Sequence, residues 1–400
     1  MKYFFRVFRV VLLFCFDIAV VTLLKIWLRF KNTKRDINNP KYGFVFTSDI
    51  GDMVIFSMFL LVFLKKVDSS CIVITSEVNA RLVTPFFPNV NFLVIDYLKY
   101  KNNLIYRFQK TQEIMSFSVD CLIVPMRSRD YCISDSIANK IKKDKTIVFS
   151  SDESNRTNLE AFIEKFIYQG KHEEFLADTH ELVAYKILLD NFEVDFQNEL
   201  RSAISVFREK ARKTNEALPF KLPQSFVLIN VGTSQVYKRW PIENYIALAE
   251  KIYLESGILS LFVGGASESF LQGSFKAYPF IIDLIMKTDN FVMLRNIIVS
   301  AKYVVSNDTF VSHYSIILGI PTFSISGGGH FGRFLPYPVD DYPMFLNSNT
   351  IFKFMPCFNC KWKCTKVIEL PSNTPFPCIS EISVKEVFAE LEKLDKKKSI

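Results

Sequence analysis

One stretch of this 400-residue chain places a group of polar side chains where an apolar run ends. Residues 304–321 read VVSNDTFVSHYSIILGIP, so the polar group 306–309 follows a strand-like run and His313 lies five residues after Asp308. Backbone N–H groups at a helix start, with the positive end of the helix dipole, form an anion site, and Thr309 would add a hydroxyl. The same pattern fits a capped helix with a buried histidine. Alone, the stretch predicts either a phosphate site or ordinary structural residues.

A second candidate follows the first apolar run of the body. Residues 48–52 read SDIGD, in which the glycine permits a tight turn and Asp52 enters the next helical stretch. An aspartate at this position can cap the helix, and spacing alone favours that role. It can also act as a general base that takes a proton from a hydroxyl.

Two later loops combine glycine with polar side chains. Thr233 and Ser234 offer hydroxyls to phosphate oxygens, and Lys238 adds a mobile positive charge. Further on, a glycine pair precedes Glu268, whose carboxylate could bind ribose hydroxyls. Each loop also fits a plain strand–loop–helix junction, with solvated basic residues in the first and an exposed first-turn carboxylate in the second.

Four of the eight cysteines lie close together near the C-terminus, at Cys357, Cys360, Cys364 and Cys378. This proximity suits zinc or disulfides, and a reducing cytoplasm disfavours disulfides. The C-x2-C-x3-C spacing departs from the standard zinc-binding pattern. Structural zinc is therefore the minor alternative to packed, reduced thiols, and no catalytic metal is expected because no Asp-x-Asp motif is evident.

The positive charge of the chain is concentrated at its start. The net charge is +8, and residues 1–41 hold nine Lys and Arg against two Asp, which is nine minus two or +7 and leaves about +1 for the rest. A nearly neutral body disfavours nucleic-acid binding. A basic start beside an apolar run favours contact with anionic lipid.

The apolar run 10–24 is interrupted only by Asp17 and one threonine. Fifteen residues are fewer than the roughly 20 that a membrane span needs, and Asp17 is costly in a bilayer. At about 100° per residue, Lys2, Arg6, Arg9 and Asp17 fall on one side of a helix. The pattern predicts a helix in the membrane interface that faces the cytoplasm, in preference to a packed helix of the soluble body. No small-residue cleavage site follows, which disfavours a signal peptide.

The remaining chain alternates short apolar runs with helical stretches, in two series. The predicted strands are 42–46, 71–74, 92–95 and 121–124 in the first series, and 226–231, 259–263, 303–305 and 322–325 in the second. Such alternation predicts parallel sheets with both faces covered. We therefore expect two doubly wound α/β domains facing across a cleft, with ligands at the carboxyl ends of the strands.

The expected organisation has five parts. They are a membrane-associated leader helix at 1–40, an N-terminal domain at 41–213, a linker at 214–223, a C-terminal domain with the cysteine cluster at 224–379, and a helix with a charged tail at 380–400.

Taken in order, these motifs resemble glycosyltransferase family 9, the heptosyltransferase-like enzymes of bacterial lipopolysaccharide assembly. The resemblance extends over about residues 42–395. It rests on Ile50-Gly51-Asp52, on Gly232-Thr233-Ser234 with Lys238-Arg239-Trp240-Pro241, on Gly264-Gly265 with Glu268, and on Asn307-Asp308-Thr309 with His313 and Gly319-x-Pro321. The cysteine cluster and the basic leader are also similar to those of some members.

The resemblance implies a GT-B fold of two Rossmann-like domains, with the acceptor in the N-terminal domain and a nucleotide-sugar donor in the C-terminal one. It also implies roles for individual residues. Asp52 matches the catalytic base; Thr233, Ser234 and Lys238 match donor phosphate contacts; Glu268 matches a nucleoside contact; and Asp308, Thr309 and His313 match the donor-site loop.

The function implied is inverting transfer of a sugar, with ADP-heptose as the family's best-known donor, in assembly of lipopolysaccharide or another cell-surface glycan. The acceptor would be a saccharide or lipid-linked saccharide at the cytoplasmic face of the inner membrane, and no cofactor is required. A Rossmann dehydrogenase is disfavoured because no Gly-x-Gly-x-x-Gly follows the first strand.

Two positions depart from the family pattern. Phe46 stands where members often have arginine, and Phe310 stands where they usually have glycine. A phenylalanine cannot adopt all backbone angles open to glycine. Phe310 therefore predicts a changed donor, or favours the alternative of a non-catalytic sugar-nucleotide or saccharide-binding protein that retains the fold.

Overall fold

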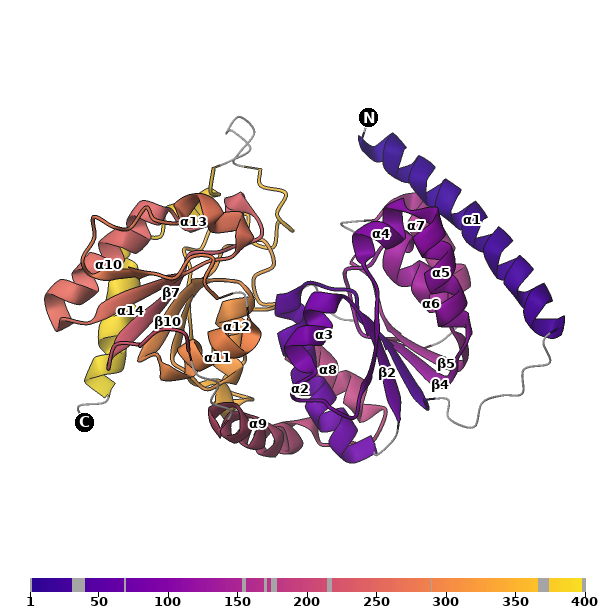
Figure 1. Cartoon of the computed structure of the whole chain (residues 1–400), viewed down its shortest axis with the longest axis horizontal. Coiled ribbons are helices and arrows are strands. Elements are labelled where there is room, and N and C mark those ends of the chain that lie inside the picture. The colour runs from indigo at the N-terminus through magenta and orange to yellow at the C-terminus, as the bar shows by residue number, and fades with distance from the viewer. Residues whose placement is uncertain are drawn as a thin grey trace. The chain divides into compact units, whose positions relative to one another are not determined.

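The computed structural model describes residues 2–30, 40–67, 70–152, 156–168, 171–173, 178–213, 218–288, 290–365 and 374–397. The chain forms two compact units (Figure 1). The first comprises Met1–Leu176 and Ile187–Val194, and the second comprises Ala177–Lys186 and Asp195–Ile400.

The first unit is built on a six-stranded parallel sheet with strand order β3-β2-β1-β4-β5-β6. Its strands are β1 (Tyr42–Val45), β2 (Cys71–Thr75), β3 (Asn91–Val94), β4 (Ser118–Val124), β5 (Lys142–Phe149) and β6 (Lys171–Glu173). Every residue of β1 is buried, as expected for a central strand of a parallel sheet with helices on both faces.

Helices of the first unit connect these strands. They are α1 (Lys2–Phe30), α2 (Ile50–Val67), α3 (Glu77–Val83), α4 (Tyr97–Asn102), α5 (Leu104–Met115), the π-helical turn η1 (Tyr131–Asp135), α6 (Ser136–Lys140) and α7 (Asn158–Ile167), while α8 (Glu181–Asp190) is shared with the second unit. The core is rich in aromatic rings because α2 is apolar on nearly every side. Phe44 of β1 packs edge-on against Phe56, Phe59 and Phe63 of α2.

The second unit repeats this topology. Its sheet has the order β12-β11-β10-β7-β8-β9, again with all neighbours parallel. The strands are β7 (Phe226–Asn230), β8 (Leu259–Val263), β9 (Ile281–Asp283), β10 (Tyr303–Asn307), β11 (Thr322–Ile325) and β12 (Ser348–Ile351). In both sheets the strand order reverses between two central strands, β1 and β4 in one and β7 and β10 in the other. This is the doubly wound arrangement.

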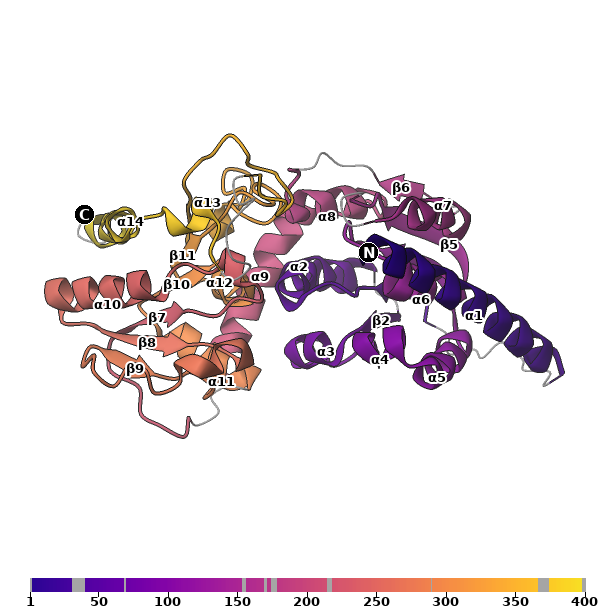
Figure 2. The same cartoon turned by 90° about the horizontal axis from the view of Figure 1, so that it is seen from above.

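The helices of the second unit surround a core that centres on Trp240. They are α9 (Phe196–Lys213), α10 (Ile242–Ser256), α11 (Phe291–Ser300), α12 (Phe310–Ile317), α13 (Pro377–Ser380) and α14 (Val384–Lys397), with short 3-10 turns η3 (Val236–Lys238), η4 (Ala266–Leu271) and η5 (Pro343–Phe345). Trp240 is fully buried, and its indole N–H donates to the carbonyl of Ile382 at 2.8 Å. This bond attaches the C-terminal segment to the core, and α14 packs against α10 (Figure 2).

The structure adds one detail to the expectation about α1. Only 3% of Asp17 is exposed, and it accepts hydrogen bonds from Arg107 of α5 and Lys140 of α6. The side of the helix that carries Asp17 therefore packs against the rest of the first unit. The apolar part is also longer than the run 10–24, because Tyr3–Ile26 is long and apolar enough to cross a membrane by length and composition.

The two doubly wound domains and all eight predicted strands are confirmed, with ends that differ by up to three residues. Strands β5, β6, β9 and β12 were not predicted. The strongly polar sequence of β5, KKDKTIVF, explains one omission, because its first four residues lack the apolar pattern of a buried strand. Part of the predicted linker (214–217) and of the tail (398–400) lies outside the described residues.

Candidate functional site

The predicted site residues of the second unit lie where the strand order reverses. β7 and β10 are neighbours, β8 lies beyond β7, and all three run parallel, so their carboxyl ends share one edge of the sheet. Open α/β sheets bind ligands at this edge, next to the reversal. The segments that directly follow these strands, including the start of α12, contain every predicted donor residue.

Asn230, the last residue of β7, ties two of these loops together. Its Nδ2 donates to Ser306 Oγ at 3.0 Å and to Thr309 Oγ1 at 3.1 Å, while its Oδ1 accepts from the backbone N–H of Gly232 at 3.3 Å. This residue was not predicted from the sequence. The available signal was an asparagine ending an otherwise apolar strand, since asparagine is depleted in strands.

The loop after β7 is held by Glu268. The carboxylate of Glu268 is 2% exposed and accepts from Arg239 at 2.6 Å, from the N–H of Gly265 at 3.1 Å and from the N–H of Thr233 at 3.4 Å. A Cβ at Gly232 would lie 3.0 Å from Glu268 Oε2, so only glycine fits without displacement. Glu268 thus supports the loop that carries Thr233; its predicted nucleoside contact stays a prediction.

Next to the start of α12, the half-buried Asp308 and the buried His313 and Tyr337 form a chain of polar contacts. His313 Nε2 lies 3.2 Å from Asp308 Oδ1, and its Nδ1 lies 3.1 Å from the hydroxyl of Tyr337. Burial alone would raise the pKa of Asp308. The hydrogen bond and charge of His313, followed by the charges of Lys238 and His330, outweigh burial and hold that pKa below its ordinary value. Asp308 is therefore an anion. Its contact with Nε2 fixes the orientation of the His313 ring, as a neighbouring carboxylate often does for a histidine.

Thr309 directly precedes α12 and has extended backbone angles, but its side chain does not cap the helix. Its hydroxyl instead lies 3.1 Å from Ser306 Oγ. Two residues before Thr309, Asn307 accepts from Tyr245 at 2.7 Å and from the N–H of Trp240 at 3.2 Å, and its Nδ2 is buried without a hydrogen-bond partner among the described residues. A helix start with uncapped N–H groups and a spare buried donor is suited to an anionic ligand.

Lys238 reaches this site from η3. Its ammonium lies 4.5 Å from the ring centroid of Trp362, and its charge acts on Asp308. Trp362 belongs to the cysteine loop and rests on the backbone after β11, where a Cβ at Gly329 would lie 2.2 Å from its ring. The cysteine loop therefore positions the aromatic ring against which Lys238 packs. Ser234 is exposed in the loop between β7 and η3.

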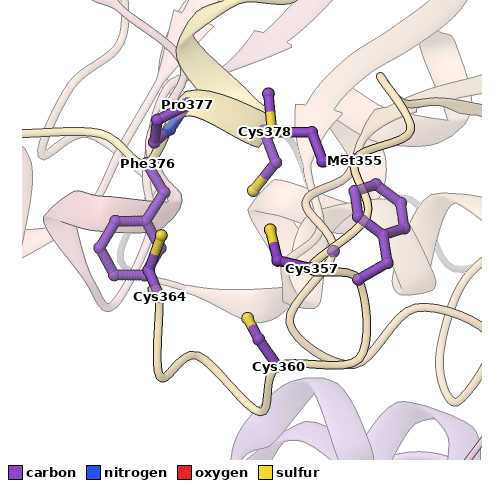
Figure 3. A pocket seen from close by; sticks show the side chains of 9 residues that line it. Met355, Cys357, Cys360, Cys364, Phe376, Pro377 and Cys378 are labelled. Carbon is purple, nitrogen blue, oxygen red and sulfur yellow. The ribbon is translucent and has the colours of Figure 1, made fainter. Parts of the chain in front are cut away.

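The four late cysteines line one small cavity of about 10 Å³ in the second unit (Figure 3). They are Cys357, Cys360, Cys364 and Cys378. All eight cysteines lie in the described residues and are free thiols. Thiolates are good ligands for zinc and iron, and Figure 3 shows the four sulfur atoms around a common space. Within the described ranges, however, no three His, Cys, Asp or Glu side chains are arranged to hold one metal ion.

Comparison with known proteins decides the family. The model of glycosyltransferase family 9 (heptosyltransferase) matches residues 138–361, more than half of the chain. The chain belongs to glycosyltransferase family 9. It is a glycosyltransferase of the heptosyltransferase type, a class that acts in lipopolysaccharide synthesis. No curated protein matches the chain in sequence.

Solved structures of this family share the fold. A family 9 glycosyltransferase from Veillonella parvula has 18% identity and a TM-score of 0.65, over 90% of this chain and 99% of that one. The E. coli heptosyltransferase WaaC with ADP-2-deoxy-2-fluoro heptose has 14% identity and a TM-score of 0.59, over 88% and 99%. The iron-containing dodecameric glycosyltransferase TibC from E. coli has 14% identity and a TM-score of 0.52, over 91% and 81%. These similarities establish the GT-B fold.

The structure explains how this family 9 chain accommodates Phe310. Phe310 is the first residue of α12 and has an ordinary helical backbone, so the position does not require the conformational freedom of glycine. Its half-buried ring stacks on Tyr314 at 5.3 Å and meets Phe291 edge-on at 5.6 Å. The ring thus joins α11 to α12, which weakens the backbone argument for a lost donor site.

Asp52 lies in the first unit, in the first turn of α2, and is partly exposed. The loop before it is fastened by Asn79, whose Nδ2 donates to the carbonyl of Ser48 at 2.9 Å, and by Thr47, whose hydroxyl lies 2.8 Å from that of Ser134. Phe46, which replaces the arginine frequent in family 9, is buried and stacks on Phe56 at 4.3 Å. At this position the chain therefore has an aromatic ring packed in the core instead of a positive charge.

Proposed function

We propose that this enzyme transfers a sugar from a nucleoside-diphosphate donor to a hydroxyl of a saccharide or lipid-linked saccharide during cell-surface glycan assembly. The observation that carries the proposal is the group of polar residues at the β7–β10 edge. Asn230 holds the loops together, Lys238 and the start of α12 supply positive charge, and Asn307 keeps a buried donor. A diphosphate matches this combination.

ADP-heptose is the donor we propose first, because WaaC is described with an ADP-heptose analogue. Thr233, Ser234 and Lys238 would contact the diphosphate, together with Thr309 and the first N–H groups of α12. Asp308 and His313 would act through position, since their carboxylate and imidazole bind one another. Glu268 would keep the loop after β7 in place.

The proposed reaction is a direct displacement that inverts the configuration at the anomeric carbon. Asp52 takes the proton from the acceptor hydroxyl, and the oxygen of that hydroxyl attacks the anomeric carbon. The bond from that carbon to the diphosphate breaks, and the nucleoside diphosphate leaves with the electron pair. Lys238 and the N–H groups of α12 stabilise the charge that builds on the leaving diphosphate.

The donor half of the proposal is tested with the purified full chain and ADP, GDP, UDP, CDP and dTDP in a thermal-shift assay. A nucleotide present at 100 times its dissociation constant stabilises the folded protein by about 2.7 kcal/mol. We expect ADP to give the largest shift. If none of the five nucleotides shifts the melting temperature, the nucleotide site is not where we propose it.

The catalytic half is tested by transfer to a membrane-lipid extract, with Asp52→Asn and a matched control. Asp49 lies on the same loop and is exposed, so Asp49→Asn changes the same charge three residues away. We expect Asp52→Asn to lose transfer while it still binds nucleotide, and Asp49→Asn to retain both. Transfer by Asp52→Asn at the wild-type rate would remove Asp52 as the base. Nucleotide binding by the wild type without transfer to any extract would favour the non-catalytic alternative.

A further inference from the structure

Helix α1 buries the side that carries Asp17 and exposes a side that is apolar. The buried positions Val10, Leu13, Asp17, Val20 and Leu24 recur every three or four residues and face the first unit. Contacts with α5, η1, α6 and α7 run along this side, and Figure 1 shows α1 lying beside those helices. A surface helix of a water-soluble protein has the opposite arrangement, with charged residues outward.

Two sets of ionic contacts hold this side. The carboxylate of Asp17 receives both Nε and Nη2 of Arg107, at 2.8 and 2.6 Å, and the ammonium of Lys140 at 2.7 Å. The hydroxyls of Tyr131 and Ser136 also donate to it, at 3.0 and 2.8 Å. Nearer the N-terminus, Arg6 pairs at 2.9 Å with a second buried carboxylate, that of Glu160 on α7. A carboxylate with five donors is fully occupied.

The outward side of α1 is apolar from Tyr3 to Ile26. Its exposed large apolar residues are Tyr3, Phe4, Phe5, Phe8, Val11, Leu12, Ile18, Leu23 and Ile26. Phe4 and Leu23, near the two ends, are 70% and 64% exposed. The positions between them on this side are Cys15, Ala19 and Thr22, so the surface has no charged side chain along its centre.

Basic side chains border this apolar surface. Arg9 and Lys25 are exposed on α1, and the first 41 residues have a formal charge of +7. Two copies of so basic a segment repel each other, whereas anionic phospholipid attracts both the charge and the apolar side. The chemistry therefore points to a lipid surface rather than to a second copy of the chain.

We propose that α1 lies in the plane of the membrane, with its exposed apolar side in an anionic lipid leaflet and its opposite side bound to the first unit through Asp17. A spanning orientation would draw Asp17 into the hydrocarbon and leave Arg107 and Lys140 buried without their carboxylate. The length and composition of Tyr3–Ile26 would permit a span, but these contacts oppose it. This inference deepens the membrane association expected for a lipid-linked acceptor, and it does not use the transfer chemistry.

Vesicle co-sedimentation of the full chain, without donor or acceptor, tests the surface. The vesicles contain phosphatidylcholine alone or phosphatidylcholine with phosphatidylglycerol. We expect binding to the anionic vesicles, and at least a tenfold weaker partition for the double variant Val11→Asp/Ile18→Asp. The matched control is Leu98→Asp/Ile105→Asp, on α4 and α5 of the same unit, where both residues are 73% exposed. We expect this control to bind as the wild type does.

Three results would overturn the proposal. The first is equal binding by the two double variants. The second is a wild-type protein that forms a dimer, does not bind vesicles, and becomes a monomer with Ile18→Asp. This result would show that α1 binds a second copy of the chain. The third concerns orientation and is tested with sealed right-side-out membrane vesicles. The proposal predicts that external protease leaves both an N-terminal tag and the body intact. Removal of the tag while the body stays protected would show that α1 spans the membrane. None of these results bears on nucleotide binding or transfer, so the proposed function is tested separately.

Discussion

Asp17→Asn is the substitution whose effect on the first unit can be worked out most fully. The variant keeps the shape of the side chain but removes its charge, which leaves the buried cations of Arg107 and Lys140 without compensation. Arg107 is 0% and Lys140 5% exposed. Loss of one partner from a buried ion pair typically costs about 3–5 kcal/mol. In a unit of this size each kcal/mol lowers the melting temperature by about 2–4 °C, so we expect a drop of roughly 6–20 °C.

The assay is thermal unfolding of the full chain followed by circular dichroism, with Asp120→Asn as the control. Asp120 is an exposed carboxylate in β4 of the same unit, so its loss should move the melting temperature by about 2 °C or less. A second check uses Lys140→Met. If the cluster acts as described, the double variant with Asp17→Asn loses less stability than the two single losses added together. An Asp17→Asn melting temperature within about 1 °C of wild type would refute the claim that the ion pairs of Asp17 stabilise the first unit.

The same residue predicts a pH dependence. Burial would raise the pKa of Asp17, but the hydrogen bond from Arg107 and the charges of Lys140 and Arg107 outweigh it and lower that pKa below the ordinary value of 3.8. A carboxylate with a depressed pKa stabilises the folded state fully above its unfolded pKa, and this contribution disappears as the pH falls through the folded pKa. The gap in melting temperature between wild type and Asp17→Asn should therefore be constant near neutral pH and narrow below about pH 3.8.

Three further substitutions test the second unit. Gly232→Ala brings a methyl group to 3.0 Å from Glu268 Oε2, so we expect nucleotide affinity to fall about tenfold by titration calorimetry, with a melting temperature lowered by only a few degrees; unchanged affinity would contradict the close approach. Tyr245→Phe removes the 2.7 Å bond to Asn307 and should cost about 1–3 kcal/mol in urea unfolding. Phe310→Gly puts glycine in a helix and removes the ring stacked on Tyr314, so we expect at least about 1 kcal/mol of destabilisation and no gain in nucleotide affinity. A tighter nucleotide complex would show that the ring obstructs the site.

Much of the fold follows from short patterns in the sequence. Apolar runs such as Phe226–Asn230 are buried on both sides, and the polar residues after them mark the carboxyl edge of the sheet. The order of motifs along the chain was enough to place Thr233, Lys238 and Asp308 in one unit. Strand β5 could not be recognised, because half of it is polar and its place depends on pairing with β4.

The contacts that define the site could not be predicted from the sequence. Nothing local distinguishes a carboxylate that binds a ribose from one that binds Arg239, which lies 29 residues away in the chain. The same holds for Asp17, whose partner Arg107 is 90 residues away. Helical periodicity correctly placed Arg6 and Asp17 on one side of α1. It could not reveal that this side packs against protein, because an amphipathic pattern does not specify which medium each face meets.

The central claim is that the β7–β10 edge of the second unit binds a nucleoside diphosphate, and Lys238→Ala tests it most directly. The measurement is titration calorimetry with ADP on wild type, on Lys238→Ala and on Lys385→Ala, a control that removes an exposed lysine from α14. A charge-assisted phosphate contact is worth about 1.5–3 kcal/mol, or roughly 10- to 150-fold in affinity. The account predicts a loss in this range for Lys238→Ala and wild-type affinity for Lys385→Ala. Equal ADP affinity in all three proteins would contradict it.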